Sequence, residues 1–315
     1  MRYHITSIAF SLGLSLLIIS CQEIPKEKTD HSSSPKETTS SKSPTEKREL
    51  SKEFKSYWYA GKAEITSYTL QQVRYGELRQ GTSALIYVTE PFLEDKQVKA
   101  DDSHSNNIPV LKLNSTKKYL TGIYPYSIMT SSFFPVKNVQ HALKVSTSVQ
   151  EWCGHVYAQL NNKEEYEIMS HSYFAREADQ QIRLKKDHLE NEIWNLIRIS
   201  PENLPIGELN MIPSLEYLRT AHREIKSYAA VASLEVVNDL KTYTIHYPEL
   251  ERTLSIHFTN AFPFHIEGWE EETNSGYGNN KQKMLSTGKM LRRIKSAYWQ
   301  QNSNADLIYR DSLGL

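Results

Sequence analysis

The sequence predicts a mainly β fold of the α+β class, namely a curved antiparallel sheet or half-barrel with one or two short helices inserted. Two observations support this expectation. Residues 54–315 contain many short segments rich in Tyr, Thr, Val and Ile, which alternate with turn-forming residues. Among them lies one segment whose apolar side chains recur at helical spacing. Strands that follow one another through short turns pair antiparallel, so we expect one strongly curved sheet.

The first strands are expected between residues 57 and 92, where the pairs Tyr75-Gly76 and Gln80-Gly81 are typical of turns. Residues 110–113 and 119–134 continue the β-prone pattern. These segments supply the first part of the sheet.

A long hairpin is expected next, with arms near 141–160 and 164–174 joined through Asn161-Asn162. In its first arm successive side chains point to opposite faces. One face carries Trp152, Val156, Ala158 and Leu160, and the other carries Glu151, Cys153, His155, Tyr157 and Gln159.

A helix interrupts the strands. Asp187, with Glu190 three positions later, resembles a capping box at its start. Its apolar face consists of Leu189, Ile193, Leu196 and Ile197. Ser200-Pro201 ends it, because proline disfavours the helical conformation in the residue before it. A second short helix is expected at 213–220. The strands then resume at 225–237, 241–247, 254–260 and 262–270, followed by a loop at 274–280 and a strand or helix from Ile294 to Trp299.

Residues 1–20 indicate a lipoprotein signal peptide. Arg2 supplies a basic start, and the 15 residues from Ile5 to Ile19 form an apolar run that suits a secretory signal. The run is too short to cross a bilayer core of about 30 Å. It ends in Leu17-Ile18-Ile19-Ser20-Cys21, which resembles the bacterial lipobox. We therefore expect cleavage before Cys21 and acylation of this residue with fatty acids such as palmitate. A plain signal peptide with a chance cysteine is the alternative.

The residues after the signal predict where the chain is held. Gln22 occupies the position at which enterobacterial lipoproteins of the inner membrane carry aspartate, so the resemblance implies an outer-membrane destination in either leaflet. Residues 21–53 are expected to form a lipidated, disordered tether, because residues 24–50 hold six Ser, four Thr, three Pro and no aromatic residue. Residues 54–315 then form a single β-rich domain.

Composition excludes several classes of function. The chain has 37 basic and 37 acidic residues, and this balance argues against a nucleic-acid binder. Two cysteines cannot build a disulfide scaffold. We expect no cofactor. We also expect no metal site, because the 11 histidines form no tight local cluster. The Gly276-Tyr277-Gly278 string lacks the third glycine of a dinucleotide-binding loop.

Several segments resemble a group of Gram-negative envelope lipoproteins, some of which carry the label septum formation inhibitor Maf. These segments are Trp58-Tyr59-Ala60-Gly61-Lys62-Ala63-Glu64, Asn304-Ala305-Asp306-Leu307 and Arg310-Asp311-Ser312-Leu313-Gly314-Leu315. The nearest match to the Maf phosphate site is Ser32-Ser33-Ser34-Pro35-Lys36, which lies in the expected tether with no strand before it. We therefore expect no Maf catalysis. A lipid-anchored curved sheet with a helix is similar in architecture to the LolA/LolB fold, although shape does not fix function.

One pair of residues suggests nucleophilic chemistry. On a strand, Cys153 and His155 would share a face, and the imidazole could activate the thiol. Such neighbours lie about 6.5–7 Å apart, which exceeds a hydrogen bond. We expect no catalytic residue, and a hydrolase that uses this pair stays an alternative.

Aromatic residues give the clearest hint of binding. The chain has 19 Tyr, 5 Trp and 9 Phe. Candidate ligand-binding residues are Trp152, Tyr157, Tyr166 and Tyr173, although tyrosines also pack in strand cores. Our hypothesis is a non-enzymatic outer-membrane lipoprotein that binds an apolar or amphiphilic ligand or an envelope partner. A surface glycan-binding lipoprotein and the hydrolase are the competing hypotheses.

Overall fold

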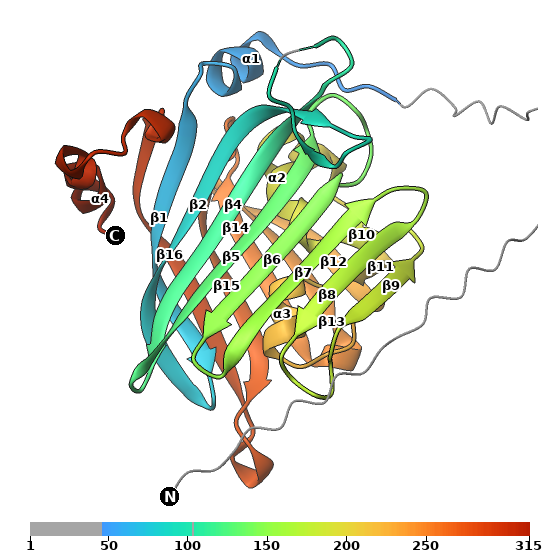
Figure 1. Ribbon diagram of the computed structural model, residues 1–315, viewed down its shortest axis with the longest axis vertical. Coiled ribbons are helices and arrows are strands. Elements are labelled where there is room, and N and C mark those ends of the chain that lie inside the picture. Colours follow the sequence, from blue (N-terminus) through green and yellow to red (C-terminus); the bar gives the residue numbers. More distant parts are fainter. Residues whose placement is uncertain (1–45, 103) are drawn as a thin grey trace, which may run out of the picture. The chain divides into compact units, whose positions relative to one another are not determined.

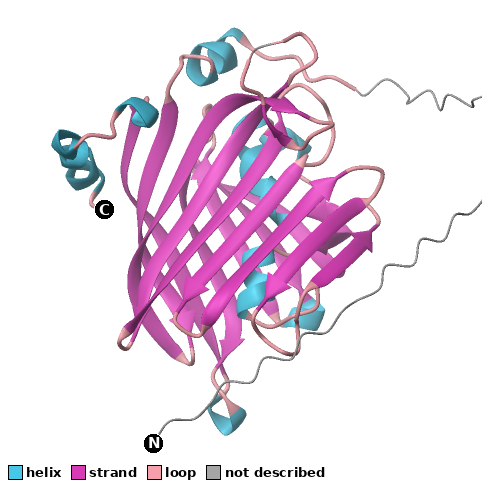
Figure 2. Ribbon diagram, in the orientation of Figure 1, coloured by secondary structure: helices cyan, strands magenta, loops and turns pink. Residues whose placement is uncertain are grey.

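One 16-stranded, strongly curved sheet organises the part of the chain that the structure describes (Figures 1 and 2). The structure is a computed structural model that describes residues 46–102 and 104–315. Its strands are β1 (Ala63–Arg74), β2 (Glu77–Leu93), β3 (Val98–Lys99), β4 (Ile108–Thr121), β5 (Tyr124–Pro135), β6 (Lys144–Glu151), β7 (Gly154–Asn162), β8 (Tyr166–Ser172), β9 (Gln180–Leu184), β10 (His188–Leu189), β11 (Gly207–Ile212), β12 (Tyr228–Val237), β13 (Leu240–Tyr247), β14 (Arg252–Thr259), β15 (Ile266–Ser275) and β16 (Gln282–Ser296).

Short helices accompany the sheet. The α-helices are α1 (Lys52–Trp58), α2 (Glu190–Ile199), α3 (Leu215–Thr220) and α4 (Ile308–Leu313). Single 3₁₀ turns lie at η1 (Pro201–Asn203), η2 (Pro248–Leu250), η3 (Gly278–Asn280), η4 (Tyr298–Gln300) and η5 (Asn304–Leu307). Among the described residues, no helix has the length and apolar character that a membrane span requires.

The strand order shows that the sheet is open. In space the strands run β10-β11-β12-β13-β14-β15-β16-β1-β2-β4-β5-β6-β7-β8-β9, and β3 pairs with β2. Neighbours pair antiparallel except β10 and β11, which are parallel. The two ends of the order, β9 and β10, are consecutive in sequence, yet they do not pair with each other. The sheet therefore curls back on itself without closing, as the sequence predicted.

Alternating burial fixes which face of each strand points inward. In β14, Leu254, Ile256 and Phe258 are buried, and the residues between them are half-buried. Helices α2 and α3 lie inside the curve, between the β2–β5 wall and the β14–β15 wall (Figure 2). Each buried aliphatic or aromatic side chain stabilises the fold by about 1.5–3 kcal/mol, so this interior supplies most of the driving force.

The predicted helix forms close to the predicted place. Leu189, not Asp187, is the N-cap of α2, and Glu192 provides the capping-box contact to the Leu189 backbone. The predicted start lies too early because the Asp187/Glu190 pair imitates the same spacing. The predicted apolar face is buried in the core, and the helix ends before Pro201 as expected. Helix α3 begins after the N-cap Ser214, whose side chain accepts a hydrogen bond from the Tyr217 N–H.

One of the two turns predicted in this region needs correction. The pair Tyr75-Gly76 does form the β1–β2 turn, whereas Gly81 lies within β2 and pairs with both neighbours. A Cβ atom at Gly81 would lie 2.2 Å from the Lys118 carbonyl oxygen, so this glycine permits close strand approach.

The expected long hairpin is three strands, β6, β7 and β8. The chain turns at Trp152 and Cys153, between β6 and β7. Trp152 is therefore exposed in the turn and does not share the buried face of β7 that includes Val156. This turn escapes prediction because it contains none of the usual turn pairs.

Both ends of the described region pack against the sheet. Residues 46–53 fall in the predicted tether, but Arg48 donates hydrogen bonds from Nη1 to the Pro135 and Asn138 carbonyls at 3.1 and 2.6 Å. Near the C-terminus, Leu313 packs on the outer face of the sheet against Ala63 and Ile65. Residues 1–45, including the predicted lipidation site Cys21, lie outside the described residues.

Candidate functional site

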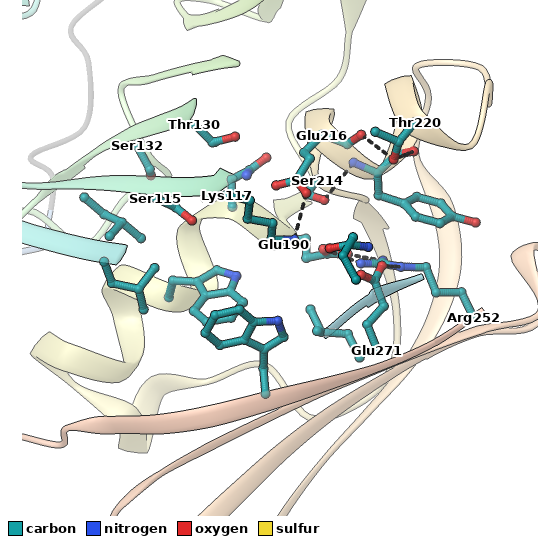
Figure 3. A pocket seen from close by; sticks show the side chains of 18 residues that line it. Ser115, Lys117, Thr130, Ser132, Glu190, Ser214, Glu216, Thr220, Arg252 and Glu271 are labelled. Carbon is teal, nitrogen blue, oxygen red and sulfur yellow. Dashed lines mark hydrogen bonds and ion pairs between the residues drawn. The ribbon is translucent and has the colours of Figure 1, made fainter. Parts of the chain in front are cut away.

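The inside of the curve contains a small polar cavity of about 70 Å³, which we call the inner cavity (Figure 3). Strands β4 and β5 form one wall, strands β14 and β15 form the opposite wall, and helices α2 and α3 contribute side chains between them. The polar lining includes Ser115 and Lys117 of β4, Thr130 and Ser132 of β5, Glu190 of α2, Ser214, Glu216 and Thr220 at α3, Arg252 of β14 and Glu271 of β15. Trp194 and Trp269 supply an apolar side, with ring centroids 5.6 Å apart. This volume holds a few water molecules but no sugar ring or acyl chain.

The charges of the inner cavity are paired with one another. Arg252 donates from its two terminal nitrogens to the Glu190 carboxylate at 2.5 and 2.8 Å, and from Nε to Glu271 at 2.6 Å. Lys117 Nζ lies 2.7 Å from Glu216. Burial acts against ionisation, but Glu190 and Glu271 together raise the pKa of Arg252 well above its ordinary value. Burial would also raise the pKa of Glu271, but Arg252 and Lys117 outweigh it and lower this pKa. The Arg252 contacts tie α2 to β14 and β15, and the Lys117–Glu216 pair ties β4 to α3.

A larger pocket of about 230 Å³ lies next to the inner cavity, and we call it the mouth pocket. The two share Gln72, Glu216, Tyr217, Thr220 and Glu271. The remaining wall includes six aromatic or basic side chains: Arg74, Tyr75, Tyr119, His222, Arg223 and Tyr277.

Two turns place the aromatic rim of the mouth pocket. Gly76 N–H donates to Ser275 Oγ at 3.0 Å, and a Cβ atom at Gly76 would lie 3.3 Å from the Gly276 Cα. Because the turns touch, Tyr75 and Tyr277 stack with centroids 6.1 Å apart and an interplanar angle of 20°. Tyr277 is 73% exposed, so its ring remains accessible to a ligand.

Arg74 holds the inner side of this rim in place. Its guanidinium lies 4.3 Å from the centroid of the Tyr75 ring. Nη1 donates to the Thr220 carbonyl at 2.6 Å, and Nη2 donates to the Tyr126 hydroxyl at 3.1 Å. Both contacts link the β1–β2 turn to helix α3 and β5.

A third pocket of about 260 Å³, the arginine pocket, shares His222 and Arg223 with the mouth pocket. Arg176 and Arg219 also line it. The guanidinium of Arg219 lies 4.2 Å from the Phe174 ring centroid, and this residue is 6% exposed, while its Nε and Nη1 donate no hydrogen bond within the described protein. Nε lies 4.0 Å from a carboxylate oxygen of Glu177. Desolvation lowers the pKa of Arg219. The charge of Glu177 acts in the opposite direction but does not outweigh the desolvation. An unsatisfied buried guanidinium is costly, and an anionic ligand group would remove that cost.

The four aromatic residues that the sequence suggested do not gather into one wall. Tyr166 is buried in the core, where its hydroxyl donates to the Asp187 carbonyl at 2.8 Å. Tyr157 is half-exposed and its hydroxyl donates to Gln159 at 2.8 Å on the same strand. Tyr173 is exposed in the loop after β8. Trp152 is exposed and stacks at 6.2 Å on Tyr124, beside Tyr126.

The nucleophile candidate lies in the β6–β7 turn. Cys153 is exposed, and its backbone N–H donates to Glu151 at 2.6 Å. A hydrogen bond with the Glu151 side chain raises the pKa of the Cys153 thiol, which opposes activation. His155 begins the exposed face of β7. The turn therefore breaks the regular strand on which the Cys153/His155 hypothesis relied.

Sequence reasoning missed the residues of all three pockets. A usable signal was present for the rim, since Tyr75 and Tyr277 each adjoin glycine in a turn. Comparison of the chain with protein-family models, with curated proteins and with solved structures gives no match.

Proposed function

We propose that this chain is a non-enzymatic, outer-membrane-anchored lipoprotein whose folded domain binds an acidic glycan across the mouth pocket and the arginine pocket. The lipobox-like sequence ending at Cys21 supports the anchor. Glycan binding is favoured over an apolar ligand and over cysteine-dependent hydrolysis because the mouth pocket combines tyrosines with polar side chains, and the arginine pocket beside it is lined by three arginines.

The observation that carries the proposal is Arg219, which lines a pocket while two of its donors lack a hydrogen-bond acceptor. A buried guanidinium in this state fits a carboxylate or sulfate group of a ligand. With Arg176 and Arg223, Arg219 makes three arginines in the lining of this pocket. The lining has two carboxylates, those of Glu177 and Glu224, so basic groups outnumber acidic ones there.

The sugar class follows from the adjoining rim. Sugar rings present apolar C–H faces and polar edges, and aromatic rings with nearby hydrogen-bonding groups bind both. Tyr277 has an exposed ring that stacks against the Tyr75 ring. Thr273 and Asn274 line the same pocket and supply polar groups.

The test compares an oligosaccharide of uronic acids with its methyl-esterified, neutral form by calorimetry on the full-length protein in detergent. We expect the acidic form to bind at least about ten-fold more tightly, which corresponds to roughly 1.4 kcal/mol. Arg219→Met should remove this preference, whereas Arg219→Lys should keep part of it.

The rim is tested separately with Tyr277→Ala, which should lower the affinity for both the acidic and the neutral sugar by roughly ten-fold. Tyr157→Ala is the matched control, because Tyr157 is a partly exposed tyrosine on β7 that lines none of the three pockets. Equal affinity for the acidic and neutral sugars would refute the anionic part. Binding of neither sugar would refute the proposal.

One observation favours the apolar or amphiphilic ligand as a second candidate. A groove of about 390 Å³ lies between the outer face of the sheet and the C-terminal segment, lined by apolar residues that include Ile65, Ile86, Met129, Ile294 and Leu313. Displacement of a fluorescent fatty acid tests this candidate. Met129→Glu should abolish the displacement, because it places a charge in the groove.

A further inference from the structure

Three side chains that could bind a metal ion meet beside the unpaired edge of strand β10. His141 precedes β6, His188 is the first residue of β10, and Glu192 lies in the first turn of α2. One ligand atom from each lies within 4.8 Å of the other two. His141 Nδ1 is 2.8 Å from Glu192 Oε1, and His188 Nδ1 is 3.9 Å from the same oxygen.

The carboxylate of this group is held in place by the backbone. Glu192 Oε2 accepts a hydrogen bond from the Ala142 N–H at 2.7 Å, and Oε1 accepts one from the Leu189 N–H at 3.2 Å. The side chain is 4% exposed. Outer-shell contacts of this kind fix the position of a metal-binding carboxylate before the ion arrives.

The two imidazoles keep access to solvent. Their side chains are 28% and 42% exposed for His141 and His188, and their ring centroids are 5.5 Å apart. The His141 ring also contacts Tyr166 edge-on at 5.9 Å. An ion could therefore enter from solvent and keep a water molecule as its remaining ligand.

The donor set matches one class of ion. Two imidazole nitrogens and one carboxylate oxygen are common zinc ligands, at about 2.0–2.2 Å from the ion. Tetrahedral coordination at that radius separates the ligand atoms by roughly 3.3 Å. The two histidine–carboxylate separations of 2.8 and 3.9 Å lie on either side of this value, and all three ligand atoms lie within 4.8 Å of one another, so side-chain movements of about an ångström suffice. We propose that His141, His188 and Glu192 form a zinc-binding site.

The position of the site gives the ion a structural effect. His188 lies on one free edge of the sheet, whereas His141 leads into β6 on the opposite wall. Residues 185–187 connect β10 to β9, the other free edge. A bound ion would tie β10 and α2 to the loop before β6, and so would restrain the unclosed seam of the sheet.

The test measures zinc binding to the metal-stripped, full-length protein by competition with a chromophoric chelator. One ion per chain is expected, with an increase in thermal stability on addition of zinc. His188→Ala removes a direct ligand and should weaken affinity at least about ten-fold, since loss of a hydrogen-bond partner of a ligand alone costs about ten- to a hundred-fold. Cobalt substitution should give the visible absorption of a four-coordinate ion.

His171→Ala is the matched control. His171 is an exposed histidine 3.3 Å from the carboxylate of Asp179, and it is not part of the three-residue group. It should bind zinc as the wild type does. His141→Ala should lower zinc affinity as much as His188→Ala does. If His141→Ala fails to fold, His188→Ala still tests the proposal, because the more exposed His188 side chain can be removed with little effect on the fold. Equal zinc affinity and equal thermal shifts in wild type and His188→Ala would overturn the proposal.

Discussion

Arg198 donates hydrogen bonds from its two terminal nitrogens to the two carboxylate oxygens of Glu64, at 2.6 and 2.7 Å, across 134 positions of sequence. Both side chains are at most 1% exposed. Tyr57 donates from its hydroxyl to the same carboxylate, and His265 Nδ1 lies 3.3 Å from it. The pair therefore fixes the C-terminal end of α2 to β1 at the centre of the sheet.

Removing one member of this pair should destabilise the fold strongly. We expect Arg198→Met to lower the free energy of unfolding by about 3–5 kcal/mol, because it leaves a buried carboxylate without its main partner. Urea unfolding followed by circular dichroism measures the change. The double variant Glu64→Gln/Arg198→Met should recover part of the loss. Arg183→Ala is the control, since its ion pair with Glu167 is 3.5 Å long and exposed, and it should change stability by less than about 1 kcal/mol.

The same pair should make the fold sensitive to acid. Burial alone would raise the pKa of Glu64, but the charge of Arg198 and the hydrogen bonds around the carboxylate hold this pKa well below its ordinary value of 4.5. With a lowered pKa in the folded state, the stabilisation is complete above pH 4.5 and is lost as the pH falls toward the folded pKa. The wild type should lose up to about 1.4 kcal/mol per pH unit more than the double variant in that range. Parallel urea curves of both proteins at pH 7 and pH 3 provide the measurement, and a constant difference would contradict the prediction.

A glycine in β16 should resist substitution. Gly288 pairs with Trp269, and a Cβ atom at Gly288 would lie 2.3 Å from the indole ring. The ring is held by Tyr68 at 4.9 Å, so it cannot move freely. We expect Gly288→Ala to cost about 1–3 kcal/mol in thermal or urea unfolding. Lys289→Ala, at the exposed neighbouring position, should be close to neutral.

The sequence predicts the sheet and helix α2 because both depend on local periodicity, which Leu254, Ile256 and Phe258 show for a strand and Ile193 and Leu196 for the helix. The contacts that organise the interior are of another kind. Glu64 looks like an ordinary strand residue and Arg198 like an ordinary helix residue until the fold brings them together. Their burial depends on that pairing, which no local pattern encodes.

The candidate sites differ in the same way. Tyr157 and Tyr173 lie near one another in sequence and so suggest a common wall, yet one faces outward on β7 and the other lies in a loop. The rim instead unites Tyr75 and Tyr277, which come from turns that are far apart in sequence and touch only in the folded sheet. The zinc ligands proposed above also come from three separate elements.

The reactivity of Cys153 separates the hydrolase hypothesis from the binding proposal. The Glu151 side chain raises the pKa of this thiol, so its alkylation by iodoacetamide should need a higher pH than that of a free cysteine. Glu151→Gln should shift the rate profile to lower pH. Rapid alkylation of the wild type near neutral pH would contradict this prediction and would restore Cys153 as a candidate nucleophile.

The anchor is tested at Cys21, because the diacylglycerol of a lipoprotein is carried on the cysteine sulfur. Cys21→Ser should abolish incorporation of radiolabelled palmitate and leave the unfolding curve of the domain unchanged, since the described fold begins beyond it. Each acyl methylene buried in a membrane contributes about 0.8 kcal/mol, so loss of the chains should release the protein once its signal segment is removed. Cys153→Ser is the matched control, since it removes the free, exposed cysteine of the domain and should keep full palmitate incorporation. If the wild type is exported and cleaved without taking up palmitate, the protein is an ordinary secreted one and the membrane-anchored part of the proposal is wrong.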